Sequence, residues 1–214
     1  MATYTATAQQ GGDDLRMLFE QRYNLQVAKS VAGPDGSPHF NVVYQSRSLA
    51  PTMSVSWTLE YGLNWTADPP NSGARVRYWG YWQPCDLGAS YDLDEAGWWV
   101  PNQNNPNTQP NALNVGRNGY QTPVHIIVGV QDANGSWQPI WVSPDTLLKN
   151  SNGEYEPLQT VQIWYEEDDK TATIIGSQKT PSLTFTYTDT TSECFMYDTQ
   201  TGVWRTPQSS PFNL

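Results

Sequence analysis

Apolar and polar residues alternate along much of this chain, which is the pattern of β-strands with one buried face. The clearest run covers residues 55–65, where six apolar side chains share one parity: Val55, Trp57, Leu59, Tyr61, Leu63 and Trp65. Nine further segments are expected to be strands: residues 23–31, 40–45, 76–82, 124–130, 140–142, 158–165, 171–175, 183–187 and 194–197. The pattern therefore predicts at least ten short strands.

Only residues 13–21 have helical spacing, with Leu15, Leu18 and Phe19 on one side and Asp13 or Asp14 as the expected cap. Sixteen glycines and 16 prolines separate the strands, and no change of composition divides the chain. We therefore predict an all-β fold, an antiparallel β-sandwich (jelly-roll-like) or a barrel. It is expected to form a single domain over residues 1–214 with at most one short helix.

Three segments share one turn pattern: DEAGWWVP at residues 94–101, DANGSWQP at 132–139 and NSNGEYEP at 150–157. In each, Asp or Asn can accept hydrogen bonds from its own turn, Gly supplies a positive φ, and an aromatic residue begins the return strand. Residues 198–207 are a looser copy. The unequal intervals exclude a fixed repeat, so we interpret the pattern as hairpin turns capped by rings. The alternative is that these rings serve as sugar platforms.

Residues 101–112, PNQNNPNTQPNA, have almost no apolar side chain to bury and contain three prolines. We predict a long polar loop here. Loops of this length in compact domains are often functional or mobile.

The composition changes the functional expectation more than the fold. The chain has 10 Trp and 12 Tyr but only 5 Phe, so the aromatic excess lies in rings with a polar group. A net charge of −10 with 11 basic residues argues against nucleic acid and anionic membranes as partners. The two cysteines, Cys85 and Cys194, are expected to be buried thiols, with one long-range disulfide as the alternative.

Neither a metal site nor a cofactor is predicted, because the acidic clusters at residues 92–95 and 166–169 lack the spacing of a known calcium loop. No segment has the length of a membrane span. The N-terminal stretch has no basic start followed by an apolar run, so the chain as written is expected to be cytoplasmic. Secretion stays open if the first Met replaces a leader.

The densest aromatic region, YWGYW at residues 78–82, is followed by Trp98, Trp99 and the Asn-rich loop. An alternating strand cannot bury rings on both faces, so some of these side chains are expected to meet solvent or a partner. We predict a non-enzymatic, lectin-like protein that binds a glycan or another small neutral polar ligand, in the form of a possible homo-oligomer. The candidate ligand-binding residues are Trp79, Trp82, Trp98, Trp99, Asn102, Asn104, Trp137 and Tyr155.

Two other functions are kept as alternatives. A small all-β glycoside hydrolase would need two carboxylates across an aromatic cleft, and Glu60 and Glu166 are the conceivable pair. No recognised glycosidase motif supports them. A membrane-docking or pore-forming protein could insert exposed Trp and Tyr into a headgroup layer, although the low Lys and Arg content removes the usual electrostatic attraction.

Overall fold

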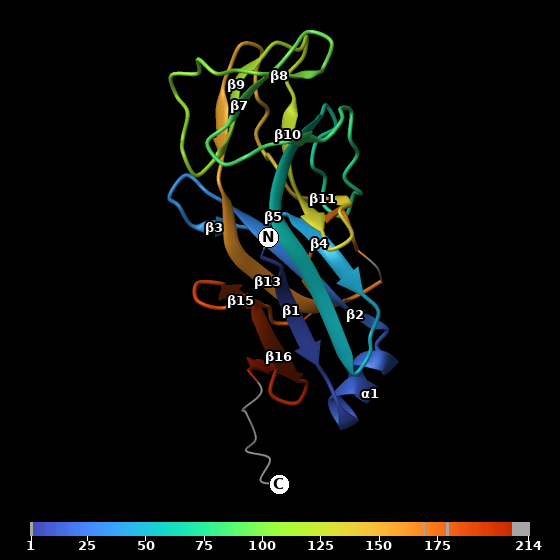
Figure 1. Cartoon of the computed structure of the whole chain (residues 1–214). Helices are drawn as coiled ribbons and strands as arrows, with labels where there is room; N and C mark the ends of the chain where they lie inside the picture. Colours follow the sequence, from blue (N-terminus) through green and yellow to red (C-terminus); the bar gives the residue numbers. More distant parts are fainter. Residues whose placement is uncertain (1, 169, 179, 207–214) are drawn as a thin grey trace.

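The computed structural model describes residues 2–168, 170–178 and 180–206, and in them the chain folds into seventeen strands and one helix (Figure 1). The strands form three sheets. The seven-stranded sheet has the order β11 (Trp137–Val142), β10 (His125–Asp132), β5 (Thr52–Thr66), β1 (Tyr4–Gln9), β16 (Ser192–Asp198) and β17 (Val203–Arg205), with β6 (Gln83–Pro84) paired to β5.

The six-stranded sheet has the order β14 (Thr173–Ile174), β4 (Val42–Arg47), β2 (Tyr23–Ala32), β13 (Pro157–Glu167) and β15 (Leu183–Thr186), with β3 (Pro38–His39) paired to β2. The four-stranded sheet has the order β12 (Gly153–Tyr155), β9 (Leu113–Asn118), β7 (Ser90–Leu93) and β8 (Trp99–Pro101). Strands β7, β8 and β9 lie at one end of the molecule, and α1 (Gly12–Glu20) and β16 lie toward the other (Figure 1).

The predicted all-β single-domain class with one short helix is confirmed. Each sheet is open over the described residues, so the barrel alternative does not apply. The pairing is mixed rather than purely antiparallel, because β1 pairs in parallel with β16 and β7 pairs in parallel with β9. Both parallel pairs join strands that are not consecutive in the chain, and residue spacing alone could not reveal them.

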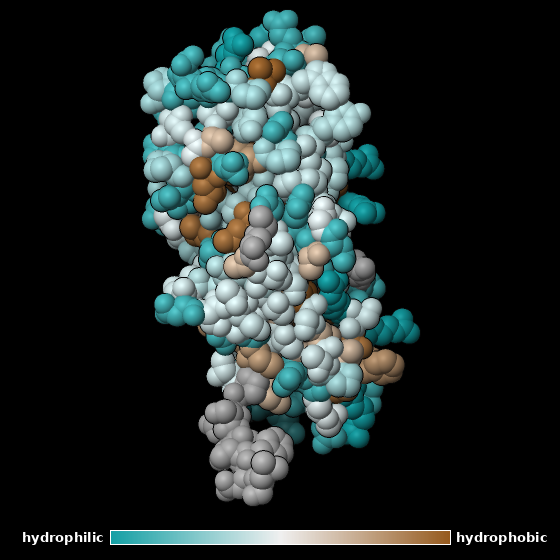
Figure 2. All heavy atoms as spheres, viewed as in Figure 1, coloured by the Kyte–Doolittle hydropathy of each residue, from teal (hydrophilic) through white to brown (hydrophobic). Residues whose placement is uncertain are grey.

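One continuous core joins the three sheets. Buried side chains from the seven-stranded sheet, such as Trp57 and Leu63, belong to the same cluster as Val27 and Tyr165 of the six-stranded sheet and Leu113 of the four-stranded sheet. The surface seen in Figure 2 is mostly hydrophilic or neutral in hydropathy, with strongly hydrophobic residues in small separate patches. The apolar area removed from water is therefore concentrated between the sheets.

The strand predicted at residues 55–65 is confirmed within β5, but its regular alternation fails at Leu59 and also at Asn64, which is fully buried. Leu59 is 37% exposed, whereas Trp57 and Tyr61 on either side are buried. Val130 of β10 pairs with Tyr61 and Asp132 pairs with Trp57, so three residues of β10 face five residues of β5. The extra residues of β5 form a bulge, which pushes Leu59 out of the core face.

The strand predicted at residues 76–82 is not formed. Its backbone makes single hydrogen bonds to different neighbours instead of one ladder: Val76 donates to the carbonyl of Ala172, and Trp79 donates to that of Trp65. Figure 1 shows the segment that precedes β6 as loops beside β10 and β11. The aromatic residues here are therefore carried by an irregular segment, whose rings need not alternate between two faces.

The helix is confirmed as α1, but its expected cap is wrong. Gly11 occupies the N-cap position and makes no side-chain hydrogen bond, whereas Asp13 and Asp14 lie in the first turn. There they are favourably placed for the helix dipole. Phe19 is 71% exposed and only Leu18 is buried, so the predicted apolar stripe packs through one residue.

Both cysteines are free thiols, Cys85 buried and Cys194 half-buried. The prediction of two buried thiols therefore holds for Cys85 and only in part for Cys194. Burial raises the pKa of Cys85 to about 12, which keeps that thiol protonated and unreactive at neutral pH.

A lysine lies within this core. Lys29 of β2 is fully buried, its Nζ lies 4.3 Å from the centroid of the Trp57 ring, and it has no hydrogen-bond partner among the described residues. Burial lowers the pKa of Lys29 from 10.5 to about 7. The cation–π contact favours the charged amine, so loss of hydration is the larger effect.

We expect Lys29→Met to stabilise the protein at pH 6, by up to about 4 kcal/mol, because Met fills similar space without a buried charge. Between pH 7 and 10.5 the unfolded wild type binds a proton that the folded state lacks, so its stability rises with pH across this window. The variant should lose that rise. Chemical denaturation at pH 6 and pH 9 measures both effects, and the exposed Lys149→Met is the control. A destabilised variant at pH 6 would contradict this account of Lys29.

Candidate ligand-binding surface

Two of the predicted hairpin turns are built identically. The Asp94 carboxylate accepts hydrogen bonds from the backbone amides of Ala96 and Trp98, at 2.9 and 2.8 Å. Gly97 has a φ of +86° and donates its amide to the carbonyl of Asp94. This is a tight turn followed by a left-handed glycine, a geometry that joins two antiparallel strands. It connects β7 to β8 and presents Trp98 at the tip.

Asp132 repeats these bonds in the β10–β11 turn, where its carboxylate accepts from Asn134 and Ser136 and Gly135 has a φ of +78°. The looser copy at Asp198 also closes a hairpin, between β16 and β17. The copy at residues 150–157 does not. There Asn150 carries the positive φ, and Gly153 begins β12, which pairs with the distant β9.

Trp65, near the end of β5, fixes the position of the aromatic segments. Its indole N–H donates to the carbonyl of Gly97 at 3.0 Å, and its own carbonyl accepts from the amide of Trp79 at 2.9 Å. Gly80 and Gly97 approach its ring so closely that an added Cβ would lie 2.4 and 2.6 Å from ring atoms. One buried indole therefore holds residues 78–82 and the β7–β8 turn together.

This arrangement brings Tyr81 and Trp98 face to face. Their rings are 5.1 Å apart between centroids and only 5° from parallel. They are 72% and 54% exposed, and Trp79 and Tyr78 are 53% and 41% exposed. Together with two neighbouring rings these residues form an aromatic surface, which consists of Tyr78, Trp79, Tyr81, Trp82, Trp98 and Trp137. Four of its six members are exposed.

The remaining two members stack on each other over a depression in the seven-stranded sheet. Trp82 and Trp137 are 5.4 Å apart and 15° from parallel. Beneath them Gly62 of β5 pairs with Gly129 of β10, and an added Cβ at either glycine would lie within 3 Å of one of the two indoles. The rings fill the space that two missing side chains leave, and the Tyr78 ring contacts Trp82 edge-on.

Of the two asparagines predicted to bind a ligand, only Asn104 is exposed. The Asn102 amide donates to the Asp92 carboxylate at 2.9 Å, and its oxygen accepts from the backbone of Asn104. Asn102 therefore supports the loop, whereas the Asn104 side chain is exposed. The loop predicted at residues 101–112 is confirmed apart from Pro101, which ends β8. It is held by the buried Asn114, whose side chain makes four hydrogen bonds to backbone groups.

The other predicted residues lie apart. Trp99 is half-buried against the core, and Tyr155 is buried and contacts Trp141 rather than the aromatic surface. Glu60 lies on β5, and Glu166 lies on β13 of another sheet. Glu166 is buried and accepts from the indole of Trp164, on the side of β13 away from Tyr165. No contact in the described residues joins the two carboxylates.

Tyr78 and Tyr81 are exposed but are not among the residues predicted from the sequence to bind a ligand. Their exposure depends on the irregular backbone of residues 78–82. The signal that could have identified them is Gly80, which interrupts the aromatic run at the point where Trp65 packs.

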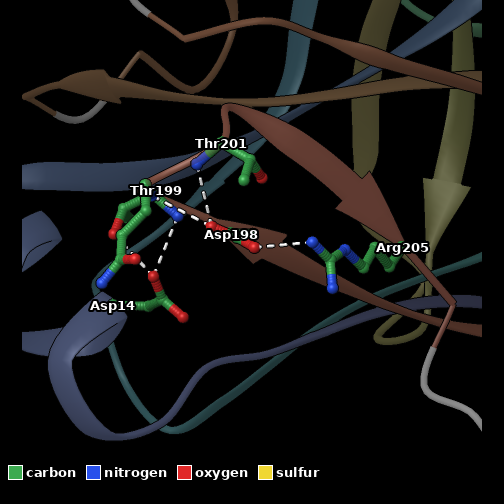
Figure 3. Close-up of polar contacts among 6 residues, drawn as sticks. Asp14, Asp198, Thr199, Thr201 and Arg205 are labelled. Carbon is green, nitrogen blue, oxygen red and sulfur yellow. Dashed lines mark hydrogen bonds and ion pairs between the residues drawn. The ribbon is translucent and has the colours of Figure 1, made fainter.

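A hollow of about 720 Å³ lies beside the β16–β17 hairpin. Figure 3 shows its polar groups bonded to one another: Thr199 donates to Asp14 through its amide and its hydroxyl, at 2.9 and 2.5 Å, and Arg205 lies 2.7 Å from the Asp198 carboxylate. Hydrogen bonds, above all from the amide of Thr201, hold the pKa of Asp198 below its ordinary value. These groups join α1 to the hairpin, a structural role.

Comparison with protein-family models, with curated proteins and with solved structures gives no match. In the described ranges, no group of three or more His, Cys, Asp or Glu side chains is placed to hold a metal ion. No helix within them is long and apolar enough to cross a membrane.

We expect Gly80→Ala to disrupt the aromatic surface, because the new methyl group would overlap the buried Trp65 indole. The expected loss of stability is about 1–3 kcal/mol. The near-ultraviolet circular dichroism of the stacked rings should fall. Gly176→Ala is the matched control, since its nearest neighbour is the hydroxyl of the exposed Ser72. Unchanged dichroism in Gly80→Ala would show that Trp65 does not position the rings.

Proposed function

We propose that this protein binds carbohydrate, without catalysing a reaction on it, at the aromatic surface. The observation that carries the proposal is the exposure of Tyr81 and Trp98 in one parallel pair. Burying a ring of this size contributes about 1.5–3 kcal/mol, so rings held in water by a rigid support imply a partner.

Sugars suit this surface better than other ligands. A pyranose has an apolar C–H face that stacks on Trp or Tyr and hydroxyl groups that need polar partners beside the ring. Glu95 and Asn104 are exposed in the segments that flank β8. Trp79 has its indole N–H 3.3 Å from the Asp68 carboxylate, which fixes its orientation.

The absence of chemistry is inferred from how the nearby carboxylate is used. One oxygen of Asp94 accepts two backbone hydrogen bonds in the turn, so this group has a structural task. The hydrolase alternative has less support, because Glu60 and Glu166 lie in different sheets and a retaining or inverting mechanism needs both carboxyl groups beside one bond.

The test is a glycan array with the purified protein, followed by titration of each hit with tryptophan fluorescence as the readout. Tyr81→Ala and Trp98→Ala should each weaken binding about tenfold, because one stacking ring contributes roughly 1.5 kcal/mol. Phe19→Ala is the matched control: Phe19 is equally exposed but belongs to α1. It should bind as the wild type does.

Three outcomes would contradict the proposal. The first is unchanged affinity in both ring variants. The second is release of reducing sugar that stops in Glu60→Gln, which would favour the hydrolase. The third is an absence of array hits together with binding to neutral phosphatidylcholine vesicles that is lost in Tyr81→Ala, which would favour membrane docking.

A further inference from the structure

A second concave site lies where the three sheets meet. This junction cleft has a volume of about 610 Å³, within the range of small-molecule sites. It is lined by residues from three parts of the fold: residues 32–34 and 39–41 around β3, residues 141 and 143–147 at and after the end of β11, and residues 154–155 of β12. It shares no residue with the aromatic surface.

Backbone and side-chain hydrogen bonds hold the walls of the junction cleft. The side-chain NH2 of Asn41 donates to the carbonyl of Val142 at 2.6 Å, and its side-chain oxygen accepts from the backbone N–H of Val142 at 3.1 Å. These two bonds join the six-stranded sheet to the edge of β11. Leu147 exchanges two backbone hydrogen bonds with Val124. The cleft is therefore preformed, and a ligand would meet little ordering cost.

Two aromatic rings form a corner of the cleft. Trp141 and Tyr155 lie 5.6 Å apart between centroids at an interplanar angle of 49°. Burial raises the pKa of the Tyr155 phenol, so this ring stays uncharged at neutral pH. Trp141 is half-buried and projects from an edge strand. Angled rings of this kind present negative π faces to a ligand.

The charged lining is predominantly acidic. Asp145 and Glu154 are both exposed, His39 is the remaining titratable group apart from Tyr155, and no Lys or Arg is among the lining residues. Among the described residues, the Glu154 carboxylate accepts a single hydrogen bond, a long contact of 3.4 Å from the Asn152 side chain. The net charge of the protein, −10, adds to the negative potential.

We propose that the junction cleft binds a small organic ammonium ion, whose alkyl groups contact Trp141 and Tyr155 and whose charge is balanced by Asp145 and Glu154. A neutral sugar could donate hydroxyl hydrogen bonds to the two carboxylates but would leave their charge unbalanced. An anion would be repelled by them. A metal ion would leave the aromatic corner unused.

The test compares choline with 3,3-dimethylbutan-1-ol, which has the same shape without the charge. Binding is followed by the indole N–H signals in a ¹H–¹⁵N spectrum, with Trp141→Phe used to assign its signal, and by calorimetry. Choline should shift the Trp141 signal and bind saturably, and the neutral alcohol should bind at least about tenfold more weakly.

Asp145→Asn and Glu154→Gln keep the shape of the cleft and should each weaken choline binding about threefold to tenfold. Glu20→Gln, an exposed carboxylate of α1, is the matched control. Equal binding of choline and the alcohol, no saturable binding of choline, or unchanged affinity in both acidic variants would each overturn the proposal.

Tyr81→Ala keeps this result separate from the proposed glycan site. That variant should retain choline binding whether or not the aromatic surface binds sugar. If Trp141→Phe abolishes glycan binding while Tyr81→Ala preserves it, the junction cleft is the sugar site and both proposals fail.

Discussion

The contact of Trp65 with two glycines is the constraint on which the exposed aromatic surface depends. Gly80 and Gly97 come from segments that have no ladder in common, and each lies against the same buried indole. A side chain at either position would overlap the ring. Both segments can therefore approach the indole this closely only because these two residues are glycine. The parallel pairing of Tyr81 with Trp98 follows from this fixed approach. A flat and rigid aromatic pair costs a ligand little conformational entropy on binding, because neither ring has to be ordered.

The sequence predicted well wherever the signal was local. Alternation identified most of β2, β5, β10 and β13, and the spacing of Asp and Gly identified the turns at Asp94, Asp132 and Asp198. The same pattern failed at Asn150, because tertiary pairing with β9 drew Gly153 into a strand. These turn motifs are thus primarily features of the fold. Their own rings, Trp99, Trp137, Tyr155 and Trp204, are half-buried or buried, and the exposed Trp98 precedes the first of them.

Which rings are exposed was predictable only in part, because Trp79 and Trp98 were expected and Tyr78 and Tyr81 were not. An excess of Trp and Tyr indicated that some rings would be wet, and four are. Which ones they are depends on contacts between residues far apart in sequence. Trp82 and Trp137 are half-buried because they pack over the facing pair Gly62 and Gly129, which no pattern within one strand reveals. The junction cleft was missed for the same reason, since its walls come from three sheets.

The parallel pairing of β1 with β16 constrains how the chain reaches its native state. Residues 5–8 lie beside residues 192–195, and β1 also pairs with β5, so the first strand of the chain is an interior strand of its sheet. During synthesis one edge of β1 stays open until β16 has left the ribosome. Closing so long a loop is slow. An early, exposed strand edge of this kind attracts other chains, so the nascent protein should benefit from chaperones that shield its N-terminal region.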